Sequence, residues 1–217
     1  MSNERMTNVM IKLMNTSFYR MPASANHHSN RTGGLLEHSL RVWHNLEMYT
    51  KSLGLKWKDP SSPFVVAMLH DACKIDAYFY NHDYGVWERD NKPKEEEEHG
   101  VLSLKKIEEL GITLTDEEKA CIRWHMGAFD KRENWAGFNE AMNEYPNVFW
   151  THVSDMVATN FDETIDRGNK CCICGKPLTG YGNNPWPVRD AGKCCDFCNL
   201  NRVIPARLIQ YEKGENS

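Results

Sequence analysis

The sequence contains no long hydrophobic run. None of its apolar segments approaches the ~18 consecutive residues that a membrane-spanning helix needs, and the opening stretch MSNERMTNVM lacks the basic region and long apolar segment of a secretion signal. Hydrophobic residues make up 41% of the 217 and charged residues 26%, as is ordinary for a soluble globular protein. These absences favour a cytoplasmic protein without a membrane partner.

Cysteine is scarce outside one short segment. Cys73 and Cys121 stand alone, whereas six cysteines crowd into 28 residues near the C-terminal end. Four of the six form two Cys-x-x-Cys pairs twenty residues apart: Cys171, Cys174, Cys195 and Cys198. In a chain without a secretion signal, this spacing indicates a structural zinc ribbon rather than disulfides. Cys172 and Cys194 do not share the spacing, and we expect them to be spare thiols.

Negative charge outweighs positive charge until the chain reaches the cysteine-rich segment. Residues 1–166 hold 18 basic and 26 acidic residues, a net charge of −8, whereas residues 167–213 hold 8 basic and 3 acidic residues, a net charge of +5. These shifts predict a domain over residues 1–167, a zinc-ribbon-like module over residues 168–213 and a tail over residues 214–217. A structural zinc would stabilise a module too small for its own core. Nucleic-acid binding is the alternative role for the module, and the basic residues that could contact phosphates are Lys170, Lys176, Arg189, Lys193, Arg202 and Arg207.

Alternation of apolar and polar residues, the sign of a strand, is missing from most of residues 1–166. Apolar residues recur there at helical spacing. The helices predicted from this spacing cover residues 5–15, 35–53, 64–74, 95–110, 115–126 and 147–165. Thr115 and Glu118 form a capping box at the start of one of them. Residues 76–94, with several aromatic residues, Gly85 and Pro93, predict an irregular loop or a short hairpin. The expected fold class is therefore mainly α.

Histidine and aspartate recur along the predicted helices in a pattern that suits a metal. The stretch LHDACKI places His70 and Asp71 side by side after an apolar segment, where burying an unpaired imidazole and carboxylate costs several kcal/mol. One candidate ligand, or a pair, falls on each successive helix, and the set is His38, His70, Asp71, His99, His125 and Asp155. Antiparallel helices can bring such side chains to one cavity, where they could hold two divalent ions bridged by Asp71.

The same residues give the sequence a resemblance to a known family. In order and flanking sequence, the segments GGLLEHSLRV, LHDACKI, EHGVLSLKKI, LTDEEKACIRWHMG and SDMVAT resemble the HD superfamily of metal-dependent phosphohydrolases, across roughly residues 20–165. They look most like its 3'-5' exoribonuclease-like branch and its uncharacterised bacterial and phage branches. The resemblance implies an HD-type helical bundle followed by the zinc-ribbon-like module.

The resemblance also implies roles for individual residues. Those implied for a first ion are His38, His70, Asp71 and Asp155. Asp71 would also bridge to a second ion held by His99 and His125, and the ions would be divalent transition metals such as Mn, Fe, Co or Ni. Asp71 and Lys74 are the predicted catalytic residues. Lys74 matches a lysine that follows the His-Asp pair in many members and could contact a phosphate oxygen or the nucleophile.

Substrate contacts are implied by a further segment. The stretch SANHHSNRTGG resembles the segment before the first histidine ligand in the exoribonuclease-like branch, which makes His28 and Arg31 candidates for substrate binding, Arg31 through its planar fork on a phosphate. Arg123 is a weaker candidate, since on a helix it would point away from the nearby ligand His125. Three single histidines are expected to be hydrogen-bonded core residues: His44, His82 and His152.

Three functions are compatible with the sequence. The first is a metal-dependent phosphohydrolase of the nucleotidase or phosphodiesterase class, which would use metal-activated water to cleave a phosphoester or phosphoanhydride of a nucleotide, a cyclic nucleotide or a nucleic-acid end. The second is a di-iron oxygenase of the HD superfamily, because such enzymes have the same order of ligands and spacing alone does not exclude iron. The third is a nucleic-acid-binding module that acts through the zinc ribbon. The intact ligand set argues against the third, and of the three functions we expect the first.

Overall fold

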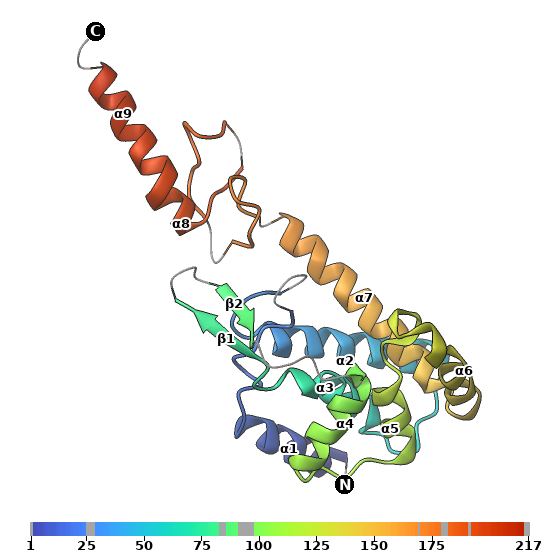
Figure 1. Ribbon diagram of the computed structural model, residues 1–217. Helices are drawn as coiled ribbons and strands as arrows, with labels where there is room; N and C mark the ends of the chain where they lie inside the picture. Colours follow the sequence, from blue (N-terminus) through green and yellow to red (C-terminus); the bar gives the residue numbers. More distant parts are fainter. Residues whose placement is uncertain are drawn as a thin grey trace.

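The chain folds mainly into helices, as the sequence predicted. The computed structural model describes residues 2–24, 29–82, 86–90, 98–168, 170–178, 182–190 and 192–214. In chain order the α-helices are α1 (Ser2–Met14), α2 (Gly34–Leu53), α3 (Ser62–Leu69), α4 (His99–Glu109), α5 (Asp116–Arg123), α6 (Trp135–Glu144), α7 (Asn147–Gly168), α8 (Asp196–Cys198) and α9 (Ile204–Gly214) (Figure 1). Shorter helical turns are η1 (Ala72–Lys74), η2 (Gly127–Phe129), η3 (Arg132–Asn134) and η4 (Asn199–Val203). Helix α6 was not predicted.

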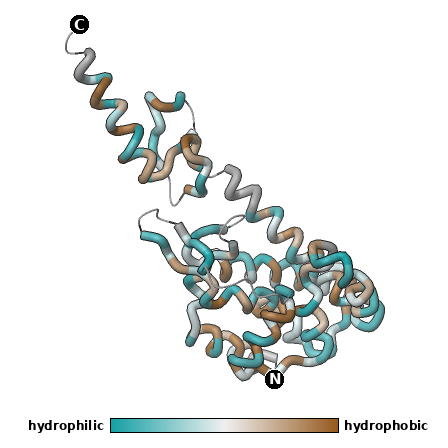
Figure 2. The backbone as a smooth tube through the Cα atoms, in the orientation of Figure 1, coloured by the Kyte–Doolittle hydropathy of each residue, from teal (hydrophilic) through white to brown (hydrophobic). Residues whose placement is uncertain are grey.

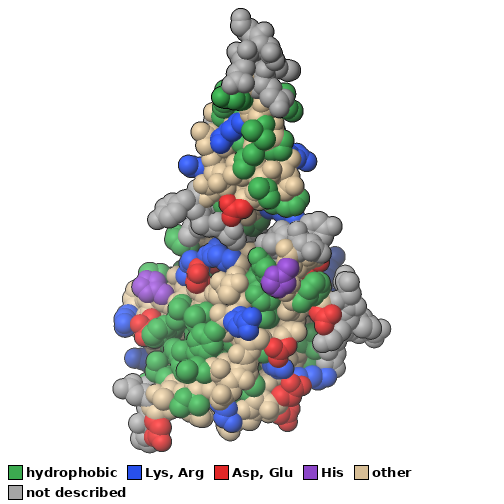
Figure 3. All heavy atoms as spheres, turned by 90° about the vertical axis from the view of Figure 1, so that its left-hand side faces the viewer, with side chains coloured by type: hydrophobic (Ala, Val, Ile, Leu, Met, Phe, Trp, Pro, Cys, Tyr) green, Lys and Arg blue, Asp and Glu red, His purple; other side chains and the backbone are tan. Residues whose placement is uncertain are grey.

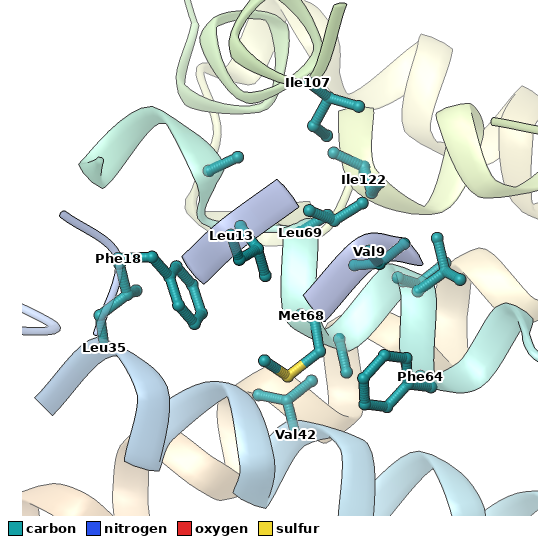
Figure 4. Packing of buried hydrophobic residues seen from close by; sticks show 14 of the residues in the cluster. Val9, Leu13, Phe18, Leu35, Val42, Phe64, Met68, Leu69, Ile107 and Ile122 are labelled. Carbon is teal, nitrogen blue, oxygen red and sulfur yellow. The ribbon is translucent and has the colours of Figure 1, made fainter. Parts of the chain in front are cut away.

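Helix α3 forms the centre of the helical core. All eight of its residues are buried, because α1, α2 and α5 pack around it, and this explains why its sequence is apolar on every side. Figure 4 shows Val9 and Leu13 of α1, Val42 of α2, and Met68 and Leu69 of α3 in one packed cluster. Burying one such side chain contributes about 1.5–3 kcal/mol, so the position of α3 in the core is strongly constrained. None of the described helices is both long enough and apolar enough to cross a membrane.

The helix before the His-Asp pair is shorter than predicted. Residues 64–74 were predicted as one helix, but α3 ends at Leu69 and the 3-10 turn η1 follows. Between them Asp71 leaves the helical conformation, with φ −103° and ψ 24°. The N–H of Lys74 then donates to the carbonyl of Asp71, three residues back. This tighter turn accompanies a second contact, in which Nζ of Lys74 lies 2.6 Å from Oδ2 of Asp71.

Two glycines allow close approaches beside the predicted ligands. At Gly34, the first residue of α2, a Cβ atom would lie 2.1 Å from the carbonyl oxygen of Ser29. At Gly100, which follows His99, a Cβ atom would lie 2.1 Å from the carbonyl oxygen of Arg123. Only glycine fits at either position, so the start of α4 lies directly against the end of α5.

A short hairpin lies between η1 and α4, within the segment where the sequence predicted a loop or hairpin. Its strands β1 (Tyr78–Asn81) and β2 (Val86–Arg89) are antiparallel and form a two-stranded sheet. The indole N–H of Trp87 donates to Oγ1 of Thr32 at 3.2 Å, and its backbone N–H donates to Oδ1 of Asn30 at 3.3 Å. These bonds attach the hairpin to the segment that leads into α2.

The residues after α7 form a smaller body with an apolar cluster of their own. The buried residues of this cluster are Cys171, Cys194, Cys198 and Val203, and they are separate from the core around α3. In Figure 1, α7 extends beyond the other helices and leads to this body, and α9 forms its far end. Figure 3 shows hydrophobic side chains gathered on its surface, and Figure 2 shows apolar and polar residues interspersed along α9. Four buried residues make a very small core, which suits a module stabilised by a metal.

Candidate metal centre

The six predicted ligands come from five parts of the fold and converge on one place. By element they are His38 in α2, His70 and Asp71 after α3, His99 at the start of α4, His125 after α5 and Asp155 in α7. The four imidazoles follow one another, with ring centroids 5.3 Å apart for His38 and His70, 5.1 Å for His70 and His125, and 5.3 Å for His99 and His125. The side chains therefore form one continuous cluster.

His38, His70 and Asp155 form a first group within the cluster. Nε2 of His38 lies 3.0 Å from Oδ1 of Asp155 and 3.3 Å from Nε2 of His70, and Nε2 of His70 lies 3.8 Å from the same carboxylate oxygen. The three ligand atoms all lie within 4.8 Å of one another, which suits donors that sit about 2.0–2.2 Å from one ion. This group could hold a divalent metal.

The Asp71 carboxylate joins the first group to a second. Its Oδ2 lies 3.3 Å from Nε2 of His70, whereas its Oδ1 lies 2.6 Å from Nε2 of His99 and 3.7 Å from Nε2 of His125. Asp71, His99 and Cys73, which the sequence left as an isolated cysteine, each place one ligand atom within 4.8 Å of the other two. Because its two oxygens face different imidazoles, Asp71 has the geometry of a carboxylate that bridges two ions ~3.5–4 Å apart.

Outer hydrogen bonds fix which nitrogen of two imidazoles faces the cluster. Nδ1 of His70 donates to the carbonyl of Ala67 at 2.8 Å, and Nδ1 of His125 donates to the carbonyl of Ile122 at 2.7 Å. A neutral imidazole that donates from Nδ1 carries its lone pair on Nε2. Both rings therefore offer Nε2 as a metal ligand.

Asp162, which the sequence analysis missed, supports His38 from the outer side. Its Oδ2 lies 3.0 Å from Nδ1 of His38, its carboxylate is buried, and its other oxygen pairs with Arg41. A carboxylate behind a metal-binding histidine fixes the orientation of the ring and strengthens its donor nitrogen. Asp162 follows Asp155 by seven residues, or about two helical turns, and this spacing was the one signal in the sequence.

Replacing Asp162 by Asn is expected to weaken metal binding while leaving all six predicted ligands in place. Loss of such an outer carboxylate lowers metal affinity by about 10–100-fold, because the His38 ring loses its anionic partner. Competition with a chelator of known affinity would measure the change. The exposed Asp116 on α5 provides the matched control, and we expect Asp116→Asn to bind metal as the unaltered chain does. Equal affinities for the two variants would contradict the role of Asp162.

One buried nitrogen in the cluster lacks a hydrogen bond. Among the described residues no group bonds to Nε2 of His125, which is 0% exposed. A buried polar atom without a partner costs about 1–3 kcal/mol. In addition, Nε2 of His38 and Nε2 of His70 are only 3.3 Å apart, and two lone pairs at that distance repel unless a proton or another cation lies between them. A metal would give the buried Nε2 of His125 a partner, so the residues fit a divalent ion.

The charges around the cluster also favour a cation. Burial opposes a charge on His38, yet the carboxylates of Asp155, Asp162 and Asp71 together outweigh burial and raise its pKa to about 9. Burial raises the pKa of Asp71, but Lys74, His70 and His99 together lower it further, so the pKa is well below its ordinary value. Burial and the neighbouring imidazoles lower the pKa of His125 to about 3. Ionised carboxylates and a neutral imidazole are the forms that bind a metal.

The residues predicted to bind substrate have other partners or lie outside the described part. The Arg31 guanidinium pairs with Glu37 at 2.5 Å, and the Arg123 guanidinium pairs with Glu98. A phosphate would have to compete with a carboxylate at either arginine. His28 lies outside the described residues. A substrate contact by these three residues stays a prediction.

The three histidines predicted to be core residues have different environments. His152 is partly buried, and its Nδ1 donates to the carbonyl of His125 at 2.8 Å, as expected of a structural histidine. His44 and His82 are exposed, so the prediction was wrong for both. His44 lies on the outer face of α2, and His82 follows the end of β1, where the hairpin leaves it in solvent.

The four paired cysteines come together in the smaller body. Cys171, Cys174, Cys195 and Cys198 place their sulfur atoms within 4.8 Å of one another. Sγ of Cys174 lies 3.8 Å from Sγ of Cys195, which matches the separation of about 3.8 Å for two sulfurs on a tetrahedral zinc with Zn–S bonds of about 2.3 Å. Gly175 follows the first pair with φ +73°, a conformation that suits glycine at a tight turn. This group could bind zinc.

Replacing Cys198 by Ser is expected to remove the zinc of this group. Three thiolates hold zinc much more weakly than four, and a module with so small a core would lose its fold with the metal. Elemental analysis after dialysis should find about one zinc fewer per chain. Cys172 lies outside the four-cysteine group, so Cys172→Ser is the matched control and should retain zinc. Equal zinc in both variants would rule out Cys198 as a ligand.

Comparisons with known proteins found no match to this chain. No family model matches it, no curated protein matches it and no solved structure matches it. Any function must therefore be argued from the geometry and chemistry of the cluster.

Proposed function

We propose that the chain is a metal-dependent phosphohydrolase built on an HD-type helical domain. The observation that carries the proposal is the Asp71 carboxylate, whose two oxygens face His70 on one side and His99 on the other. Two divalent ions held on either side of such a carboxylate would polarise a phosphoester and lower the pKa of a coordinated water. The order of the ligands along the chain, and its resemblance to the HD superfamily, support this proposal.

Lys74 is the cation that the chain itself brings to the cluster. Its Nζ lies 2.6 Å from Oδ2 of Asp71. Burial opposes the charge, but Asp71 and the other neighbouring groups together outweigh burial and raise the pKa of Lys74, so the ammonium is charged at neutral pH. We assign Lys74 the role of donating to a phosphate oxygen and stabilising the negative charge that develops there during hydrolysis.

The exposure of the side chains indicates where a phosphate group would approach. His70 and His125 are fully buried and Asp71 is nearly so, and they form the floor of the cluster. The side chains of His99 and Lys74 are 29% and 15% exposed. A phosphate at this open side would contact Lys74 and the metals together, while the bulk of the substrate stays on the protein surface. This geometry suits nucleotides, cyclic nucleotides and nucleic-acid ends alike.

The basic module supplies a possible second contact with nucleic acid. Five of its six predicted basic residues are exposed: Lys170, Lys176, Arg189, Lys193 and Arg202. Arg207 instead donates to the carbonyls of Trp186 and Asn184, at 2.9 Å each. Exposed lysines and arginines bind phosphates in a salt-dependent way. We therefore propose that nucleic-acid ends are included among the substrates, with the module holding the rest of the strand.

Metal analysis followed by an activity screen tests the proposed function. The full chain, purified without added metal, is expected to contain one zinc in the cysteine group and up to two transition-metal ions in the cluster. With manganese supplied and oxygen excluded, it should release phosphate or nucleotide from at least one of the three substrate classes. Turnover that requires both iron and oxygen would favour the oxygenase. Salt-sensitive binding of nucleic acid without hydrolysis of any phosphoester would favour the binding module.

A further inference from the structure

Cys73 lies beside the second side of the Asp71 carboxylate. It belongs to η1, two residues after Asp71, and is partly buried. Its Sγ lies 3.3 Å from Nδ1 and 3.4 Å from Nε2 of His99. The cluster as predicted from the sequence contained only nitrogen and oxygen donors. Cys73 adds a sulfur atom on the side of Asp71 that faces His99.

The distances suit a sulfur and a nitrogen bound to the same ion. A tetrahedral metal with a bond of about 2.3 Å to sulfur and about 2.0–2.1 Å to nitrogen separates these two donors by about 3.5 Å. The observed separation between Sγ of Cys73 and Nε2 of His99 is 3.4 Å. Nε2 of His99 and Oδ1 of Asp71 are closer, at 2.6 Å, and would need to move apart by under about 1 Å to share the ion.

A second, independent observation points to a ligand at the same place. Nε2 of His125 is fully buried, has no hydrogen-bond partner among the described residues and lies 3.7 Å from Oδ1 of Asp71. The rings of His99 and His125 are adjacent, with centroids 5.3 Å apart. The lone pair of His125 is therefore available on the side of Asp71 where Cys73 and His99 lie.

We propose that Cys73 is a ligand of the second metal ion. This ion would take the sulfur of Cys73, a nitrogen of His99 and Oδ1 of Asp71, with Nε2 of His125 facing the same carboxylate oxygen, and the inference rests on the two-ion site of the proposed function. On binding, the thiol releases its proton to solvent and the thiolate donates to the metal.

The sulfur gives the two positions different metal preferences. Thiolate ligands favour thiophilic ions such as Zn²⁺, Co²⁺ and Cd²⁺, whereas imidazole and carboxylate alone also suit Mn²⁺. The position of His38, His70 and Asp155 has no sulfur among its ligands. The cluster is therefore built to hold a thiophilic ion next to a harder one.

Cadmium binding to the full chain tests the role of Cys73 without relying on catalysis. The protein is kept in its zinc-bound form, titrated with ¹¹³Cd²⁺ and examined by cadmium NMR. A site with one sulfur and a site with four sulfurs give well-separated resonances, so any exchange into the four-cysteine group is recognised. The variants are Cys73→Ser and, as a matched control for the other isolated cysteine, Cys121→Ser. Circular dichroism verifies that each variant is folded.

The expected result is a one-sulfur resonance in the unaltered chain and in Cys121→Ser that is lost from Cys73→Ser. The cadmium affinity of Cys73→Ser should fall by at least about tenfold, because loss of a residue that only supports a ligand already costs about 10–100-fold. Its manganese affinity should change much less. An unchanged spectrum in folded Cys73→Ser would overturn the inference, as would a chain that binds no cadmium beside Asp71. A Cys73-dependent resonance in a protein that hydrolyses no phosphoester would uphold the ligand and reject the phosphohydrolase.

Discussion

Replacing Asp71 by Asn is expected to reduce phosphoester hydrolysis by at least about a thousandfold, because two metals together contribute several kcal/mol of charge stabilisation and about 4 kcal/mol corresponds to that factor. The carboxylate faces both sides of the cluster, with Oδ1 2.6 Å from His99 and Oδ2 3.3 Å from His70. An amide has one oxygen and no negative charge, so it cannot bridge two ions and it attracts the Lys74 ammonium less strongly. Turnover and metal content should fall together.

The measurement pairs steady-state hydrolysis with elemental analysis of the same preparation. The control is Asp116→Asn, which changes an exposed carboxylate at the start of α5 and should keep both metal content and turnover. A folded Asp71→Asn protein that retains two ions and full turnover would remove Asp71 from the mechanism. Loss of turnover with both ions retained would instead limit its role to holding Lys74.

The sequence was most informative where chemistry and spacing coincide. A histidine next to an aspartate after a buried segment was a strong signal, because burial of both groups requires compensation. The structure brings His70 and Asp71 together with the other four predicted ligands. The four-cysteine group was equally predictable, because a Cys-x-x-Cys pair places two sulfurs on one turn, and the sequence contains two such pairs.

Local spacing could not reveal contacts that depend on how the helices pack. Asp162 supports His38 across the contact between α2 and α7. The sequence of either helix alone does not indicate that these two residues meet. Cys73 was assigned no role because it stands apart from the cysteine-rich segment, and only the fold places it 3.3 Å from His99. His44 was expected in the core, yet the outer face of α2 is in solvent.

A further long-range contact that the sequence did not predict joins α1 to α5. Glu118 was predicted only as the capping residue opposite Thr115, and that capping box is confirmed. The Glu118 carboxylate also accepts hydrogen bonds from both terminal nitrogens of Arg5, at 2.6 Å each, and from the hydroxyl of Ser62 at 2.7 Å. Glu118 is 0% exposed, so one buried carboxylate connects α1, α3 and α5.

Replacing Glu118 by Ala is therefore expected to lower the free energy of unfolding of the helical domain by about 3–5 kcal/mol, the usual cost of leaving one partner of a buried ion pair alone. Urea unfolding followed by tryptophan fluorescence measures it, since six of the seven tryptophans precede residue 168. Glu109→Ala, which breaks an exposed pair with Lys106, should cost no more than about 1 kcal/mol. If the Arg5 contact is responsible, adding Arg5→Ala to Glu118→Ala should cost much less than Arg5→Ala costs alone, because the shared interaction is already gone. Fully additive losses would show that Glu118 acts through Ser62 and the cap of α5 instead.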